Sequence, residues 1–119
     1  MISTSWWLRD KTGQPVLMAG DGHTHHDMMV FDFTIPEVQA LFVSACLNYT
    51  STPWVDGCFV DRSLDTGLPW DVIGIDKQAA YEAAHLAVQQ QMQAGIGHNP
   101  LIANHAYRMS KVNAAQVSF

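Results

Sequence analysis

The chain has 119 residues, a length that fits one domain and suffices to bury a core. Its 6 Lys and Arg residues against 11 Asp and Glu residues give a net charge of -5 without a basic cluster, so no nucleic-acid partner is expected. No apolar run approaches the roughly 18–20 residues that span a bilayer, and the first residues lack the basic and apolar regions of a signal peptide, so neither a membrane partner nor an export signal is expected.

The N-terminal part is predicted to form a hairpin, a strand and the start of a helix. Residues 6–17 contain two apolar stretches around the polar run Asp10 to Gln14, which is typical of an edge hairpin. After a polar loop, the apolar run Met28 to Phe33 predicts a strand. Thr34-Ile35-Pro36-Glu37 has the form of a capping box, so a helix is expected from here to about Leu47.

The rest of the chain continues the alternation. The run Val55 to Val60 is short and apolar, as expected of a strand covered on both faces. Residues 63–75 show no periodicity and predict a loop. Asp76 is suited to cap a second helix, and Gly95 is suited to end it in a left-handed conformation. The segment Pro100 to Asn104 predicts another strand, and a weakly helical tail follows.

This order of elements predicts an α/β protein. Apolar strands that alternate with helices are typical of a parallel sheet built from right-handed crossovers. No linker or internal repeat interrupts the pattern. We therefore expect a single α/β unit over residues 1–119, with an N-terminal β-hairpin and a mostly parallel sheet.

Two carboxylates are predicted at strand ends. Asp61 follows the strand Val55 to Val60, and Asp32 lies near the end of the preceding predicted strand. Because parallel sheets bind ligands at the carboxyl ends of their strands, both carboxylates could face one cleft, as glycosidic cleavage requires. In the structural alternative, Asp32 belongs to the turn into the helix, and Asp61 pairs with Arg62 or caps a loop.

A histidine-rich loop offers a different kind of site. It contains His23, His25 and His26, followed by Asp27, and imidazole and carboxylate groups are zinc or iron ligands. A metal-dependent hydrolase using His23, His25 and Asp27 is therefore one alternative. Because no later His-Asp pattern has a confirming spacing, we prefer a solvated or sugar-facing loop.

The two cysteines lie in neighbouring predicted elements. Cys46 is on the apolar face of the first helix, and Cys58 should point from the following strand toward the helices, so a disulfide is geometrically plausible. We favour buried free thiols, because these are the more frequent outcome. Asn48-Tyr49-Thr50 fits the N-glycosylation pattern, which leaves secretion open.

Two segments carry a resemblance to a known family. Val30-Phe31-Asp32-Phe33-Thr34-Ile35-Pro36-Glu37-Val38 and Val55-Asp56-Gly57-Cys58-Phe59-Val60-Asp61 resemble the glycoside-hydrolase-like (β/α)-barrel proteins, in particular glycoside hydrolase family 114. The resemblance spans roughly residues 6–104. It implies that Asp61 is a site acid with Asp32 as its partner. The Asn that usually follows this acid is replaced here by Arg62, and no Glu follows a later strand.

Length then limits the expected architecture. A complete barrel takes roughly 200 residues, whereas this chain offers about three βα units. We therefore predict a partial (β/α) barrel, a fragment that can self-associate through exposed sheet edges. The leading hypothesis is a carbohydrate-active hydrolase without a cofactor, acting on a carbohydrate substrate through Asp61 and Asp32. Substrate binding is assigned to Asn104, His105, Trp70 and Arg62. A catalytically inert fragment or carbohydrate-binding remnant is the remaining alternative.

Overall fold

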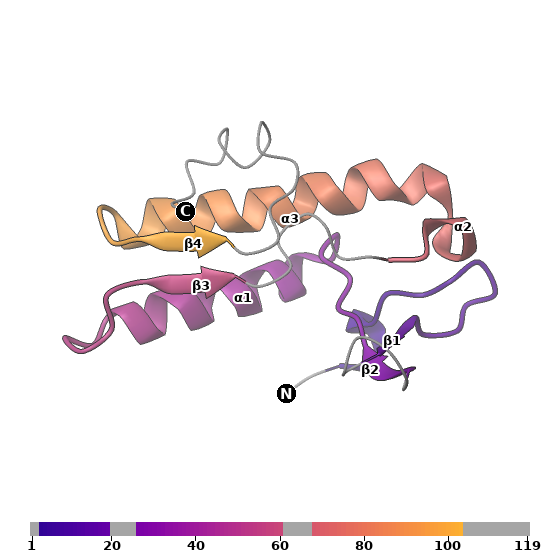
Figure 1. The fold of residues 1–119 in the computed structure, drawn as a ribbon, viewed down its shortest axis with the longest axis horizontal. Helices are drawn as coiled ribbons and strands as arrows, with labels where there is room; N and C mark the ends of the chain where they lie inside the picture. The colour runs from indigo at the N-terminus through magenta and orange to yellow at the C-terminus, as the bar shows by residue number, and fades with distance from the viewer. Residues whose placement is uncertain (1–2, 20–25, 61–67, 104–119) are drawn as a thin grey trace.

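The structure, a computed structural model, describes residues 3–19, 26–60 and 68–103. In these ranges the chain forms one short 3-10 helix, three α-helices and four short strands (Figure 1). In chain order they are η1 (Thr4–Trp6), β1 (Leu17–Ala19), β2 (His26–Met29), α1 (Pro36–Thr50), β3 (Cys58–Val60), α2 (Trp70–Ile73), α3 (Ile75–Ile96) and β4 (Leu101–Ala103). None of the helices in these ranges is both long and apolar enough to cross a membrane.

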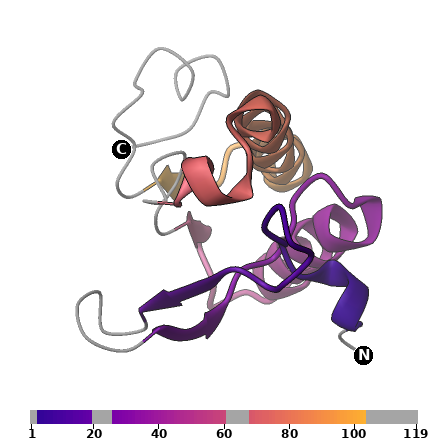
Figure 2. The ribbon, with the colours of Figure 1, turned by 90° about the vertical axis from the view of Figure 1, so that its right-hand side faces the viewer.

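Helices α1 and α3 lie side by side and form the main layer of the fold (Figure 1). Strands β3 and β4 pair in parallel on one side of this layer, with β3 in contact with α1 and β4 in contact with α3 (Figure 2). The core between them contains four fully buried apolar side chains, which are Val38, Ile73, Val88 and Leu101. Because α1 and α3 bury opposed faces, tertiary packing rather than helix propensity holds the two helices in place.

Two glycines allow backbone segments to approach closely at one end of the fold. A Cβ on Gly95 would overlap Cδ2 of Leu47, so a side chain at this position would require the Leu47 side chain to shift. A Cβ on Gly57 would collide with the carbonyl of Pro100, which accepts a hydrogen bond from the Cys58 amide at 3.1 Å. Gly57 therefore sets the start of the β3–β4 pairing.

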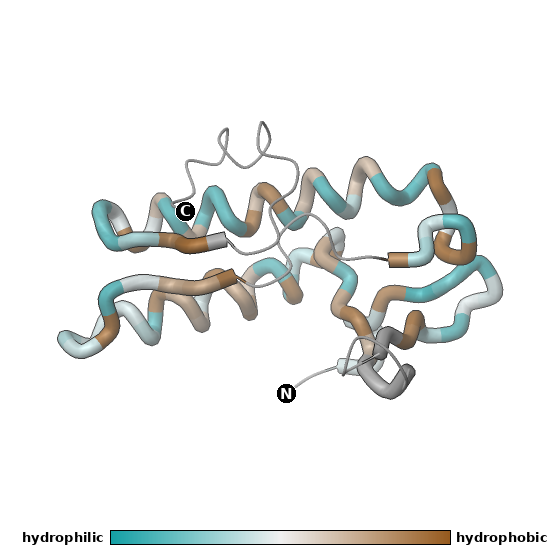
Figure 3. The backbone as a smooth tube through the Cα atoms, in the orientation of Figure 1, coloured by the Kyte–Doolittle hydropathy of each residue, from teal (hydrophilic) through white to brown (hydrophobic). Residues whose placement is uncertain are grey.

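The β3–β4 sheet has one covered face and one open face. Cys58 and Val60 pack against the core, whereas Phe59 is 63% exposed and its register partner Ile102 is 42% exposed. Hydrophobic positions are visible in both strands (Figure 3). We call the exposed side, marked by Phe59 and Ile102, the outer face. The expectation that β3 is covered on both faces is therefore wrong.

The N-terminal segment differs from the predicted hairpin. Residues 6–16 form no strand, and the one bridge within this stretch is the isolated antiparallel bridge between Arg9 and Pro15. A second isolated antiparallel bridge joins Trp7 to Phe31. The turn between Arg9 and Pro15 is held by the Asp10 carboxylate, which accepts hydrogen bonds from the Thr12 amide at 2.8 Å and the Gln14 amide at 3.1 Å. The antiparallel pairing follows later, between β1 and β2.

The predicted partial (β/α) barrel is also wrong. In the described ranges β3 and β4 form a parallel pair by themselves, and β1 and β2 form a separate antiparallel pair. The run Met28 to Phe33 was the expected third parallel strand, but β2 ends at Met29 and the chain then turns into α1. The rings of Phe31 and Phe33 pack against Phe42 of α1, at centroid distances of 5.4 and 4.9 Å. These side chains belong to an aromatic cluster and do not extend a parallel sheet.

The two long helices begin and end differently from the sequence-based expectation. Ile35 is the N-cap residue of α1 and supplies no side-chain hydrogen bond, so the predicted capping box is absent. Helix α3 begins after Gly74 rather than at an Asp76 cap. It ends at Ile96, and its C-cap residue is Gly97, whose φ of 65° lies in the left-handed region. The predicted end residue, Gly95, lies within the helix and packs against Leu47.

Candidate functional site

The carboxyl ends of β3 and β4 lie level with each other. The register pairs Cys58 with Leu101, Phe59 with Ile102 and Val60 with Ala103, so both strands stop at the same pair. Asp61 and Asn104 are the next residues in the sequence after these two strand ends. Four of the predicted site residues lie outside the described residues, namely Asp61, Arg62, Asn104 and His105.

Asp32 lies in the turn that leads into α1. Its Oδ1 atom accepts a hydrogen bond from the Thr34 amide at 3.0 Å and from the Thr34 hydroxyl at 2.6 Å, and its carbonyl accepts from the Ile35 amide at 3.1 Å. This is an Asx turn, which fixes the direction of the chain at the helix start. The Thr34 hydroxyl is thus committed to Asp32, which explains why no capping box forms.

Next to Asp32 lies a cluster of aromatic side chains that joins the N-terminal segment to α3. Trp7 contacts Phe31, Phe31 and Phe33 contact Phe42, and the Phe33 ring is stacked on His85 with a centroid distance of 4.5 Å and an interplanar angle of 20°. Stacked and edge-to-face pairs of this kind stabilise a fold beyond the area that they bury. The cluster therefore gives Asp32 a rigid support.

The two titratable side chains of this cluster, Tyr81 and His85, are uncharged at neutral pH. Burial, with a smaller contribution from the negative charge of Asp32, raises the pKa of Tyr81 above its ordinary value, and the Tyr81 hydroxyl donates to the Phe31 carbonyl at 3.4 Å. Burial lowers the pKa of His85 to about 4. At neutral pH the cluster therefore holds a protonated phenol and an uncharged imidazole.

Trp70 begins the short helix α2 and is half-buried. Its ring meets the ring of Tyr81 edge-to-face at a centroid distance of 5.3 Å. Part of its surface is thus used for packing against α3, and its assignment to sugar binding stays a prediction. A large aromatic side chain with more free surface is Phe59 on the outer face, two residues before Asp61 in the sequence.

The metal-binding alternative for the histidine-rich loop is not tested by the residues that the structure describes. His23 and His25 lie outside the described residues, and Asp27 lies in β2. Among the side chains that the structure describes, no group of three or more His, Cys, Asp or Glu residues is arranged to hold a metal ion. The metal-dependent alternative stays a prediction.

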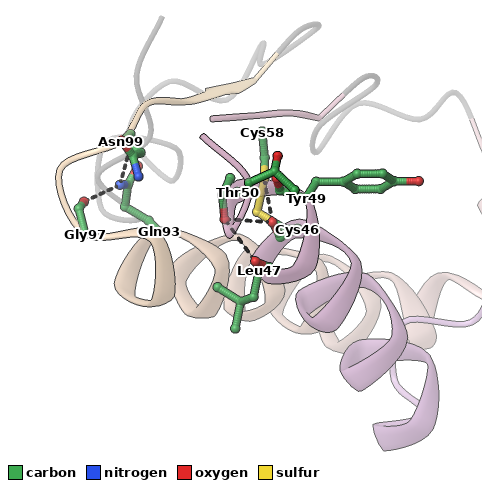
Figure 4. Close-up of a disulfide and its surroundings, with 9 residues drawn as sticks. Cys46, Leu47, Tyr49, Thr50, Cys58, Gln93, Gly97 and Asn99 are labelled. Atoms are coloured by element: carbon green, nitrogen blue, oxygen red, sulfur yellow. Dashed lines mark hydrogen bonds between the residues drawn. A yellow bond between two sulfur atoms is a disulfide. The ribbon is translucent and has the colours of Figure 1, made fainter. Parts of the chain in front are cut away.

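Cys46 and Cys58 form a disulfide between α1 and β3, with a Cα–Cα distance of 5.9 Å (Figure 4). Our preference for free thiols is therefore wrong, whereas the expected orientation of Cys58 toward the helices is confirmed. The bond closes the chain between α1 and β3, so it holds the N-terminal end of β3 on the helix layer. On the same side of the fold, Gln93 Nε2 donates to the carbonyls of Gly97 and Asn99, each at 3.0 Å, and so holds the turn from α3 into β4 (Figure 4).

Sequence reasoning missed two features of this region. No role was predicted for Tyr81 or His85, although a titratable ring at a core position of a helix is a recognisable signal of a shifted pKa. Phe59 was treated as covered, because a short apolar run cannot show which of its faces is open.

No family model matches the chain, and the search of curated proteins finds no relative.

Proposed function

We propose that the chain acts as a carbohydrate-active hydrolase whose site lies at the carboxyl edge of β3 and β4. The observation that carries the proposal is the level ending of these two parallel strands at Val60 and Ala103. In parallel sheets this edge is where ligands bind, because the segments that follow the strands converge there. Asp61 and Asn104 each follow a strand end by one peptide bond.

The alternation of side chains along a strand also supports a site at this edge. Residues two apart share a face, so Asp61 is expected on the side of Phe59, and Asn104 on the side of Ile102. Both are therefore expected above the outer face. An exposed aromatic ring beside a carboxylate and an amide is a suitable surface for a sugar, since the ring can stack on the apolar face of the sugar while the polar groups bind its hydroxyls.

In the proposed reaction Asp61 is one of the two carboxyl groups. One carboxyl group protonates the oxygen of the leaving sugar, and the second attacks the anomeric carbon or activates a water molecule. Asp32 is the candidate for the second group. Its Oδ1 atom is used by Thr34, and Oδ2 makes no hydrogen bond to another residue that the structure describes. Asn104, His105 and Arg62 are proposed to bind sugar hydroxyls.

The test is release of reducing ends from a panel of polysaccharides and amino-sugar polymers. Asp61→Asn should abolish hydrolysis while thermal unfolding stays unchanged. Asp56→Asn is the matched control, because Asp56 is an exposed carboxylate that precedes β3 rather than following it. Hydrolysis that survives in the Asp61 variant, or is lost equally in the Asp56 variant, contradicts the proposal.

Phe59→Ala separates binding from chemistry. Because Phe59 is largely exposed, its removal should leave the fold intact. We expect a rise in KM with little change in kcat, since a stacking contact acts on the bound sugar before and during the reaction alike. An unchanged KM would show that Phe59 does not bind the sugar. The role of Asp61 would then depend on the result for Asp61→Asn alone.

A further inference from the structure

The acceptor pattern Asn48-Tyr49-Thr50 lies in the last turn of α1. The Asn48 side chain is exposed, and Tyr49 beside it is 68% exposed and points away from the helix layer (Figure 4). The chain contains no second Asn-X-Ser/Thr triplet. A glycan on Asn48 would therefore extend from the surface of the folded protein without displacing any core side chain.

The disulfide also favours glycosylation at this surface, because it indicates an oxidising compartment. Cys46 is two residues before Asn48, and it is bonded to Cys58. Disulfides persist in oxidising compartments such as the secretory pathway, which is also where chains that carry this triplet receive glycans. The exposed side chain, the acceptor triplet and the nearby disulfide thus all favour glycosylation of Asn48. None of these three observations depends on the proposed hydrolase activity.

The structure also constrains when the glycan can be added. In the fold the Thr50 hydroxyl donates to the carbonyl of Cys46 at 2.9 Å and to that of Leu47 at 3.2 Å (Figure 4). Since the acceptor pattern is defined by both the Asn and the hydroxyl residue, a hydroxyl held by the helix is not free for recognition. The triplet also lies inside the loop that the disulfide closes.

We propose that Asn48 is an N-glycosylation site that is modified before α1 and the Cys46–Cys58 bond close around it. In the transfer step the side-chain amide nitrogen of Asn48 attacks the first carbon of a sugar carried on a lipid diphosphate. A bond between nitrogen and carbon forms, the bond from that carbon to the diphosphate oxygen breaks, and the amide loses one proton. The lipid diphosphate leaves with the electron pair, so no oxidant or reductant is required.

The experiment expresses the full chain behind a secretion leader in a glycosylating eukaryotic host. The readout is the mass of the chain before and after an N-glycan amidase, which removes the glycan and converts the modified Asn to Asp. The wild type should carry a glycan at Asn48, and Asn48→Gln and Thr50→Ala should lose it completely. Asn99→Gln is the matched control, because Asn99 is exposed but followed by Pro100, and it should leave the glycan in place.

Timing is tested by delaying closure of the loop. A Cys46→Ala, Cys58→Ala double variant should raise the glycosylated fraction, measured on total newly made chain so that misfolded material is counted. A wild-type chain that leaves the host with its disulfide formed and Asn48 unmodified would overturn the site. A glycosylated fraction that is equal with and without the disulfide would overturn the proposed order of events.

Discussion

The contribution of the Cys46–Cys58 bond to stability can be worked out from the position of the two residues. They are 12 residues apart, and the chain-entropy relation for a loop of this size gives about 3 kcal/mol of stabilisation through the unfolded state. The perturbation is the double variant Cys46→Ala, Cys58→Ala, because alanine avoids burying a new hydroxyl at the nearly inaccessible Cys46 position.

Urea unfolding followed by circular dichroism measures the effect. The variant should lose about 3 kcal/mol of unfolding free energy, which corresponds to a fall in Tm of roughly 10–15 °C for a chain of this size. Ser44→Ala is the control, since Ser44 is exposed on the same helix and should shift stability by less than about 0.5 kcal/mol. A loss below about 1 kcal/mol would refute the reasoning, as would two thiols that react with an alkylating reagent in the native, unreduced protein.

Three further predictions concern the helix contact and the cluster around Asp32. Gly95→Ala should cost about 1 kcal/mol in urea unfolding, because the cost of displacing the Leu47 side chain, about 1–3 kcal/mol, exceeds the helix-propensity gain of about 1 kcal/mol. The folded-state pKa of His85, about 4, lies below the ordinary value of 6.5, so neutral His85 stabilises the fold above pH 6.5 and this stability is lost as the pH falls toward 4. The loss should be about 3 kcal/mol and should shrink in His85→Phe, as measured by urea unfolding at a series of pH values. Asp32→Ala should cost about 1–2 kcal/mol because the Thr34 amide and hydroxyl lose their acceptor, whereas Asp32→Asn should keep most of that stability; equal losses in the two variants would contradict the Asx-turn role.

The positions of the long helices could be predicted from local pattern, whereas the sheet could not. Pro36 at the start of α1 and the alanine-rich run of α3 act within one or two turns, so the sequence alone indicates both helices. Strand pairing depends on contacts far apart in the chain. An apolar run such as Met28 to Phe33 serves equally well as a buried strand or as the source of Phe31 and Phe33 for an aromatic cluster.

The candidate site, like the fold, could be predicted only in part from the sequence. Asp32 was open to a turn role and a catalytic role from its sequence neighbours. The hydrogen bonds from Thr34 show the turn role, and the catalytic role stays a prediction. The burial of His85 depends on which side chain stacks on it, in this case Phe33, and no local pattern contains that information. The disulfide depends on how α1 packs against β3, which local sequence permits without requiring it.

The location of the proposed site can be tested without knowing the bond that is cleaved. Backbone amide resonances are recorded while oligosaccharides from the panel are added to the intact chain. The account predicts shifts at Val60 and Ala103, at the carboxyl edge of β3 and β4, and at the exposed Phe59, with none at Gly97 at the other end of the sheet. Shifts confined to the Gly97 end, or no shift at the carboxyl edge with any of the sugars, would contradict it.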